Sequence, residues 1–449
     1  MSNLHRAAAQ LQELLTAAAE QAAWETGACQ RTSPLSGATL VQTLVLGYLA
    51  DPQAALEDLA QTAALLGHPV TPQALDQRFS RALAACLERL LGQAAGRVAG
   101  APATAAVLRK FTAVLVQDST TVTLPDALAA YWRGCGTATG QGGEAAVKFQ
   151  VRLDLVRGQL RGLTVEQGRD SDHATPLQTA DLRPGELHLR DLGYFDLDVL
   201  GTIAAAGAFY LTRLQDSTRL YTAAGVPLDL AAWARRPQGA VIDQPVLLGA
   251  RQRLAARLVM VRVPADVAAA RRRTLRAKAR KKGYTPSQDK LALCDWNVFV
   301  TNVPAEVLDV DEVLALARAR WQVECLFRHW KSDGGLTQSR SRKPWRVACE
   351  VFARLLALVL ADSQVLVACG VLLGRSLRRA WRAVRRLAGM IAGALRSRRA
   401  LVRVLHLLAR SLRRAARVEK RRQQPAAFQV LNDPYRQGHR KFAQQKRVA

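Results

Sequence analysis

Apolar residues recur every three or four positions over residues 1–100, which predicts a helical N-terminal domain. Within it, the Gly-His-Pro sequence at 67–69 should end a first helix over about 55–66, and Thr71 is a good N-cap for a second. The second helix would expose four side chains able to reach base edges or phosphates: Gln73, Gln77, Arg78 and Arg81. This outline is typical of a DNA-binding helix-turn-helix, and equally of two helices packed in any helical domain.

Beyond residue 108 the pattern changes to alternating or continuous apolar runs, which predict β-strands. We expect a helix over about 175–181 and another in the sequence FDLDVLGTIAAAG, between strands of the same sheet. The expected strands are 113–124, 147–156, 159–168, a short strand that runs into a turn at 187–195, and 209–214. Strands followed by alternating strands and helices predict an α/β layered sheet.

Residues 215–295 interrupt this alternation with further strand-like runs and a basic helix, and we interpret them as an inserted subdomain. A strand at 296–304 should return to the main sheet, followed by a long amphipathic helix over about 311–332 and helices to about 422. The apolar run 351–374 is long enough to span a membrane, but Arg354 and Asp362 interrupt it, which favours a buried helix.

The charge is strongly positive and unevenly placed. The formal net charge of the 449 residues is +28. Residues 1–108 carry 6 Lys and Arg against 8 Asp and Glu, whereas residues 340–449 carry 27 against 4. A genome rich in G and C would favour Arg over Lys, but it does not explain the lack of acidic residues. A polyanionic partner is therefore favoured, with Arg378 and Arg379 as candidate contacts.

Seven cysteines are scattered without a CxxC pair, so neither a zinc ribbon nor a redox motif is indicated. Such usage is typical of a reducing cytoplasm, and the polar N-terminal sequence has no signal-peptide core. We therefore expect a cytoplasmic protein that is not bound to a membrane.

Three carboxylates are candidates for catalysis. Asp118 and Asp191 each follow an apolar run that should be a strand, and Glu324 lies on the amphipathic helix. Taken singly, the two Asp residues are ordinary strand terminators, and Glu324 could simply pair with Arg320. Taken together, three carboxylates could bind two Mg²⁺ ions, with Mn²⁺ as a substitute, for phosphoryl transfer. Arg320 and Lys331, on the same helical face as Glu324, would hold DNA phosphates.

These motifs resemble those of insertion-sequence transposases with an RNase H-like DDE catalytic domain, in the group marked by a YREK signature. Arg320, Glu324 and Lys331 match that signature in spacing, while Ala317 stands where the group has Tyr. The sequence DLGYF at 191–195 matches a second motif of the group, with Leu in place of Arg. The resemblance covers roughly residues 110–345.

The resemblance implies an RNase H-like catalytic core with an inserted β-rich subdomain, flanked by helical N-terminal and C-terminal regions. The ranges are 1–100 for the N-terminal domain, 109–214 and 296–374 for the catalytic domain, 215–295 for the insertion, and 375–449 for a basic helical region with a flexible tail. Asp118, Asp191 and Glu324 would be the catalytic metal ligands. The implied partners are double-stranded DNA, at terminal inverted repeats and target sites, and a second copy in a synaptic homodimer, at the nucleoid of a prokaryote.

Two alternatives remain open. The chain could be a catalytically inactive or domesticated DNA-binding protein derived from a transposase, or another RNase H-like nuclease such as a resolvase or repair nuclease. Among the remaining residues, Trp233 could stack on a DNA base or pack in the insertion. His329 is interpreted as a surface or packing residue, and the loop 170–173 as capping or as support for the active site.

Overall fold

The computed structural model describes residues 3–95, 105–136, 143–235, 239–369, 376–415 and 427–437. The chain forms two compact units. The first unit comprises Met1–Ala103, Asp118–Leu177 and Gln322–Glu419, and the second comprises Thr104–Gln117, Gln178–Trp321 and Lys420–Ala449. The predicted domain ranges divide the chain at other points, and their assignment as domains stays a prediction.

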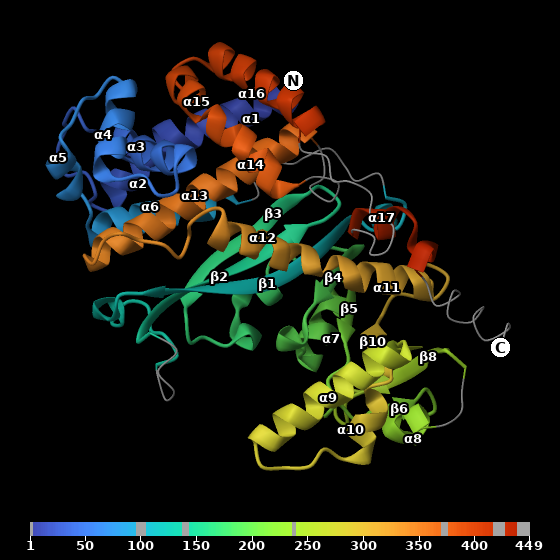
Figure 1. The fold of residues 1–449 in the computed structure, drawn as a ribbon. Coiled ribbons are helices and arrows are strands. Elements are labelled where there is room, and N and C mark those ends of the chain that lie inside the picture. The colour runs from blue at the N-terminus through green and yellow to red at the C-terminus, as the bar shows by residue number, and fades with distance from the viewer. Residues whose placement is uncertain are drawn as a thin grey trace. The chain divides into compact units, whose positions relative to one another are not determined.

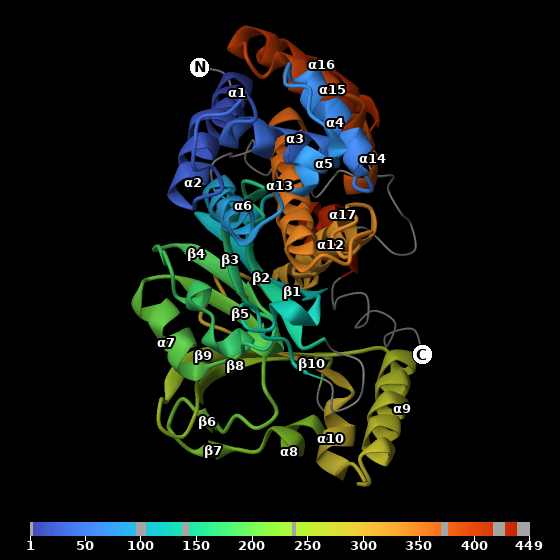
Figure 2. The same cartoon turned by 90° about the vertical axis from the view of Figure 1, so that its left-hand side faces the viewer.

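Helices make up most of the first unit (Figure 1). They are α1 (Asn3–Glu13), a π-helix (Leu14–Ala18), α2 (Ala19–Glu25), α3 (Gly37–Ala50), α4 (Leu56–Leu65), α5 (Pro72–Asp76), α6 (Arg81–Ala94), α12 (Trp321–Ser332), α13 (Pro344–Cys369), α14 (Leu377–Arg386), α15 (Ala388–Ala394) and α16 (Arg398–Ala415). Helix α13 packs against α3, α6 and α16, as Figures 1 and 2 show. The predominantly helical character expected for residues 1–100 is therefore present over the described residues 3–95.

The second helix expected at the N-terminal domain is shorter than predicted. The side chain of Thr71 accepts a hydrogen bond from the Ala74 N–H at 3.2 Å, as an N-cap should, but α5 ends at Asp76. A new helix, α6, begins after Ser80, whose hydroxyl accepts from the Leu83 N–H at 3.3 Å. A cap at this position starts a separate helix, so the predicted recognition helix is wrong in its extent. The candidate DNA contacts Gln77 and Arg78 lie in the turn between the two helices, with Gln77 exposed and Arg78 half-buried.

Helix α13 contains residues 351–369 of the apolar run that could have been taken for a membrane span, and the rest of the run, 370–374, lies outside the described residues. Its side chains from Val351 to Ala361 are almost completely buried, as predicted for a buried helix. The two interrupting charges are also buried and paired: Arg354 lies 3.2 Å from Glu350, and Asp362 accepts hydrogen bonds from two indole groups. Among the described residues, no helix is long and apolar enough to cross a membrane.

Burial raises the pKa of Glu88, on α6 of the first unit. Its ionised form therefore destabilises the fold at neutral pH, and this cost is absent below the unfolded pKa of about 4.3. We expect Glu88→Gln to raise the free energy of unfolding at neutral pH, with a gain that shrinks as the pH falls to about 4. Urea denaturation across this range measures it. The exposed Glu57, changed to Gln, should give no such gain, and a gain independent of pH would contradict the explanation.

Strands β2 (Ala145–Asp154) and β3 (Gln159–Gln167) form an antiparallel hairpin in the first unit, and β2 is the neighbour of β1 (Ala113–Leu124). These strands lie within two residues of their predicted positions. The helix predicted over about 175–181 is wrong: Pro176–Gln178 forms a single 3-10 turn. Thr175, held extended before Pro176, does not begin a helix, and the carbonyl of Gln178 accepts a hydrogen bond from Arg190 instead of a helical N–H.

The second unit is built on a mixed sheet in the order β1-β4-β5-β10-β9-β8-β6-β7, which confirms the α/β class. Its strands are β4 (Glu186–Arg190), β5 (Phe209–Arg213), β6 (Leu220–Thr222), β7 (Pro227–Leu228), β8 (Val241–Leu248), β9 (Leu254–Arg262) and β10 (Trp296–Thr301). Its helices are α7 (Leu197–Ala205), α8 (Leu230–Arg235), α9 (Ala265–Lys281), α10 (Gln288–Leu293), α11 (Val310–Ala319) and α17 (Ala427–Asn432). Strand β4 is parallel to both β1 and β5, and the remaining pairs are antiparallel.

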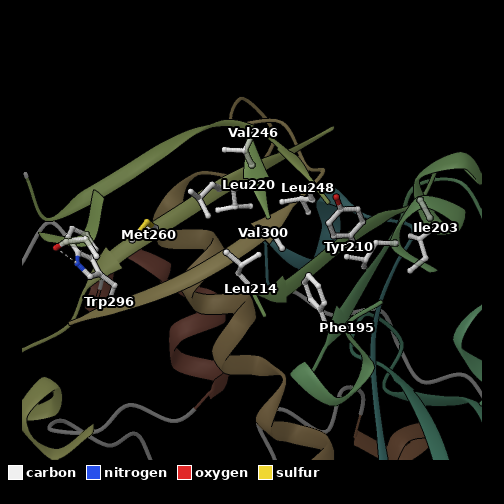
Figure 3. Packing of buried hydrophobic residues seen from close by; sticks show 14 residues of the cluster. Phe195, Ile203, Tyr210, Leu214, Leu220, Val246, Leu248, Met260, Trp296 and Val300 are labelled. Carbon is white, nitrogen blue, oxygen red and sulfur yellow. Dashed lines mark hydrogen bonds between the residues drawn. The ribbon is translucent and has the colours of Figure 1, made fainter. Parts of the chain in front are cut away.

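The strands of the predicted insertion continue this sheet and share its core. Strand β10 pairs with β5 on one side and with β9 on the other. Figure 3 shows apolar side chains from β5, β8, β9, β10 and α7 in one cluster, among them Tyr210, Met260 and Val300. The Trp296 indole N–H donates to the Ala234 carbonyl at 3.3 Å, and Trp233 packs against the same cluster. The packing interpretation of Trp233 is therefore favoured over base stacking.

Candidate active site

Asp191 directly follows β4, at the strand end where the sequence places it. Its Oδ1 lies 3.6 Å from Nη2 of Arg320, and the two side chains are 43% and 21% exposed. The carboxylate is therefore accessible to a ligand and already carries a cationic neighbour. In α/β sheets, ligand sites gather at the carboxyl ends of parallel strands, and β4 and β5 both end here.

Asp118 does not close its strand, which corrects the prediction. Strand β1 continues to Leu124, because it has β2 as a sheet neighbour after its pairing with β4 ends at Val116. The side chains of residues 113–117 are buried, and that of Asp118 is partly exposed, with its Oδ1 accepting from the Ser119 N–H at 2.9 Å. Asp118 therefore marks the point along β1 where the buried segment ends.

Glu324 and Lys331 lie on α12, but the single helix predicted over about 311–332 is interrupted. Helix α11 ends at Ala319, Arg320 is its C-cap, and α12 begins at Trp321. Glu324 is partly exposed, while burial lowers the pKa of Lys331. Glu324 and Asp118 belong to the first unit, and Asp191 and Arg320 to the second. From their spacing in the sequence, Arg320 and Glu324 were predicted to lie on one continuous helix, and the break at Arg320 corrects this prediction.

The donor set of the three carboxylates suits Mg²⁺, a hard cation that prefers oxygen ligands. Among the described residues, no group of three or more His, Cys, Asp or Glu side chains is gathered in reach of one ion. The three carboxylates are divided between the two units, so their convergence on metal ions stays a prediction.

The second unit contains a cavity of about 470 Å³, here termed the arginine cavity. Its basic lining residues are Arg190, Arg213, Arg271, Arg318 and Arg320. They come from the ends of β4 and β5, from α9, and from α11 with its C-cap. Ala317 also lines the cavity, as do Val430 and Pro434 from the C-terminal segment.

Two of these arginines are held firmly by the protein. Arg271 donates to the Trp296 carbonyl at 3.0 Å and to Oδ1 of Asn297 at 2.7 Å. Burial lowers its pKa, and the neighbouring charge of Arg213 lowers it further. Arg190 is almost fully buried and donates to the Gln178 side chain and carbonyl. The buried Asp311 also lines the cavity, but the five arginines outnumber it, so the cavity is suited to an anionic ligand such as a phosphate group.

Three residues of the cavity, Arg190, Arg213 and Arg271, were not among the site residues predicted from the sequence. A signal existed for the first two, because each is a charged residue at the end of an apolar strand, next to Asp191 or on the neighbouring strand. Arg271 lies in a helix with many basic residues and nothing in its local pattern distinguishes it.

Four other candidates lie in the first unit: Asp172, His329, Arg378 and Arg379. Asp172 accepts hydrogen bonds from Lys148 at 3.1 Å and from Gln150 at 2.9 Å. His329 is buried, which confirms packing rather than surface exposure, and its Nδ1 lies 3.1 Å from Asp333. Among the basic candidates on α14, Arg378 Nε lies 3.2 Å from Asp333 Oδ1, and the side chain of Arg379 is exposed.

Comparison with known proteins assigns the family. A family model described as "Transposase DDE domain" matches residues 109–360, more than half of the 449 residues. The transposase for insertion sequence element IS231F of Bacillus thuringiensis subsp. israelensis is 30% identical over 276 residues, which are 57% of this chain and 57% of the relative. The transposase for IS231C of B. thuringiensis subsp. berliner is 27% identical over 325 residues, 68% of this chain and 67% of the relative. The transposase for IS1151 of Clostridium perfringens is 25% identical over 284 residues, 59% of each chain. These matches span about three fifths to two thirds of the relatives' lengths, and the chain belongs to the transposase DDE domain family.

Proposed function

We propose that this protein is an insertion-sequence transposase that cuts DNA at the ends of its element and joins the freed 3′-hydroxyl to another phosphodiester. The observation that carries the proposal is the family match over residues 109–360, which contains Asp118, Asp191 and Glu324 together. The relatives are named as transposases for insertion sequence elements. The alternative, a DNA-binding protein without catalysis, assigns no role to these three carboxylates.

The metal ligands in this proposal are Asp118, Asp191 and Glu324. Support for the two Asp residues comes from the register of β1 with β4, in which Val116 pairs with Leu189. Each Asp lies two residues beyond this last pair, Asp118 on β1 and Asp191 directly after β4. When bound, two Mg²⁺ ions, or Mn²⁺ in their place, supply the Lewis acidity that phosphoryl transfer needs.

The residues of the arginine cavity bind and orient the DNA backbone. The guanidinium group of Arg320 offers several N–H donors to a phosphate oxygen, and its distance of 3.6 Å from Asp191 brings such a phosphate to the carboxylate. Arg271 has a fixed position, so it can hold a further phosphate without a large loss of side-chain entropy. The chain's share of the reaction is therefore to bind DNA and to place one phosphodiester at the carboxylates.

Finer features remain part of the proposal. An RNase H-like core, implied by the resemblance, is supported by the parallel strands β1, β4 and β5 beside the β2–β3 hairpin. Two element ends must be handled together, so we propose a synaptic homodimer on double-stranded DNA.

The assay for the function is cleavage, in Mg²⁺ or Mn²⁺, of a duplex that carries the DNA flanking the gene. Binding without cleavage in either metal would favour the non-catalytic alternative.

Arg320→Ala should weaken both DNA binding and cleavage. A charge-assisted hydrogen bond contributes about 1.5–3 kcal/mol, so the affinity should fall by roughly 10-fold to 100-fold. The slope of log affinity against log salt concentration should fall by close to 0.9, which corresponds to the loss of about one phosphate contact. Arg320→Lys keeps the charge and serves as the matched control: it should keep the salt slope of the parent and lose only the affinity that comes from the planar guanidinium donors. Fluorescence anisotropy and a cleavage gel on the same preparations measure both steps. Full binding with lost cleavage would instead assign Arg320 to positioning Asp191.

A further inference from the structure

A second basic hollow lies in the first unit, outside residues 109–360 that match the transposase domain. It has a volume of about 450 Å³ and is here termed the α14 hollow. Its lining residues come from α14, the residue after it, and α16: Arg379, Arg382, Ala383, Arg386, Leu387, Leu407 and Ser411. Three arginines line it, and none of these lining residues is acidic.

The arginines of α14 divide into two groups with different surroundings. Arg378 lies 3.2 Å from the carboxylate of Asp333. Arg385 donates to the Asp333 carbonyl, lies 5.3 Å from the centre of the Trp381 ring, and has a pKa lowered by burial. These two arginines therefore join α14 to Asp333, in the segment that follows α12.

The three remaining arginines of α14 line the α14 hollow. Arg379, Arg382 and Arg386 have exposed side chains and face the α14 hollow. Spacings of three, four and seven residues place them on one helical face, over about 10 Å of helix length. No acidic side chain is among the described residues that line the hollow, so its three guanidinium groups give it a positive charge that suits an anion.

We propose that the α14 hollow binds backbone phosphates of double-stranded DNA, at a site separate from the carboxylates. The inference rests on the proposed function for the choice of DNA as the polyanion. Guanidinium groups are suited to phosphate oxygens because their planar donors bind two at a time. Leu387 and Leu407 form an apolar part of the lining, and Ser411 adds a hydroxyl group.

The hollow is connected to the helix that carries Glu324 by contacts within the first unit. Asp362 on α13 accepts hydrogen bonds from Trp330 of α12 at 2.9 Å and from Trp381 of α14 at 3.0 Å. His329 of α12 also packs against Trp381, with ring centres 5.2 Å apart. DNA bound in the hollow is therefore held at a fixed distance from α12, so the site would position the duplex as well as add affinity.

The test replaces Arg379, Arg382 and Arg386 together by Gln. Binding of a fluorescein-labelled DNA duplex of mixed sequence is measured by anisotropy over a series of salt concentrations. We expect the slope of log affinity against log salt to fall by about 2–3, at close to 0.9 for each lost phosphate contact. The matched control changes Arg6, Arg31 and Arg89 to Gln, which removes the same charge from exposed positions of the N-terminal region. The control should change the slope by less than about 1.

A charge-preserving triple variant, with Lys at the three positions, should keep most of the slope. It also covers the case in which the Gln variant fails to fold, which circular dichroism would show. A slope equal to that of the parent in the Gln variant, or a Lys variant that loses as much as the Gln variant, would overturn the phosphate site. Tighter binding of duplex RNA than of duplex DNA through these arginines would overturn the choice of DNA.

The test of the phosphate site and the test of the transposase activity can fail independently. A parent protein that binds DNA with the full slope but never cleaves it in Mg²⁺ or Mn²⁺ contradicts the transposase activity and leaves the phosphate site standing. A parent that cleaves DNA, with an unchanged slope in the Gln variant, contradicts the phosphate site alone.

Discussion

Asp191→Asn is expected to abolish DNA cleavage while leaving DNA binding intact. The substitution removes one charge with almost no change in volume. If Asp191 is a metal ligand, ion binding weakens and the transition state loses its main electrostatic support, so cleavage should fall by at least about 10³-fold. Binding should change little, because it depends on Arg and Lys contacts to phosphates. Loss of the carboxylate also leaves Arg320 more available to DNA, since the two groups lie 3.6 Å apart in the absence of a substrate.

The matched control is Asp196→Asn, five residues further along the chain. Asp196 caps α7 by accepting hydrogen bonds from Asp198 N–H at 2.8 Å and Val199 N–H at 3.1 Å. Asn is as good an N-cap as Asp, so this variant should cleave DNA like the parent. Asp118→Asn and Glu324→Gln should behave like Asp191→Asn. A gel-shift and a cleavage gel on the same preparations separate the two steps. Normal cleavage by Asp191→Asn would remove it from the set of metal ligands.

Much of the sheet could be predicted because its signals are local. The apolar runs that became β1, β4 and β5 lie within one or two residues of their predicted bounds, and Asp191 follows β4 as expected. The length of β1 also follows from the alternation of apolar and polar residues along it. Whether the strand ends at Asp118, however, depends on β2, a neighbouring strand from elsewhere in the chain. Strand β1 loses β4 as a partner after Val116 and continues beside β2. The interpretation of Asp118 as a strand end could not anticipate that second partner.

The site itself was less predictable, because its walls come from distant segments. The arginine cavity is lined from Leu189 on β4 to Pro434 in the C-terminal segment, and helical or strand periodicity carries no signal for such an assembly. The break at Arg320 has a similar origin. A helix over about 311–332 is continuous by periodicity, yet α11 belongs to the second unit and almost all of α12 to the first. Tertiary packing in each unit, rather than local propensity, sets the point at which the helix is interrupted.

Asp362 is the second residue whose replacement should have a large effect, in this case on stability. Its carboxylate is fully surrounded by protein, where burial raises its pKa. Oδ2 accepts from the Trp330 indole at 2.9 Å, and Oδ1 accepts from the Trp381 indole at 3.0 Å. One acidic side chain on α13 thereby joins α12 to α14. An apolar residue would be the ordinary choice in such a helix, so the acceptor function explains the Asp.

Asp362→Ala should lower the free energy of unfolding by about 3–5 kcal/mol. Two buried indole N–H groups would lose their acceptor, at about 1–3 kcal/mol each, and a small cavity would add to the loss. Urea denaturation measures the change. Ser363→Ala, at the next position, removes only the hydroxyl bond to the Val359 carbonyl and is the control, with an expected change within about 1 kcal/mol.

Two further variants decide whether the indole contacts are responsible for the loss. Trp330→Phe and Trp381→Phe each keep an aromatic ring and remove the donor. In the double Phe background, Asp362 no longer has its two indole donors, so Asp362→Ala should cost much less than in the parent. The difference between the two backgrounds gives the coupling between the carboxylate and the indoles. An equal loss in both backgrounds would contradict the acceptor role and assign the effect of Asp362→Ala to the cavity alone.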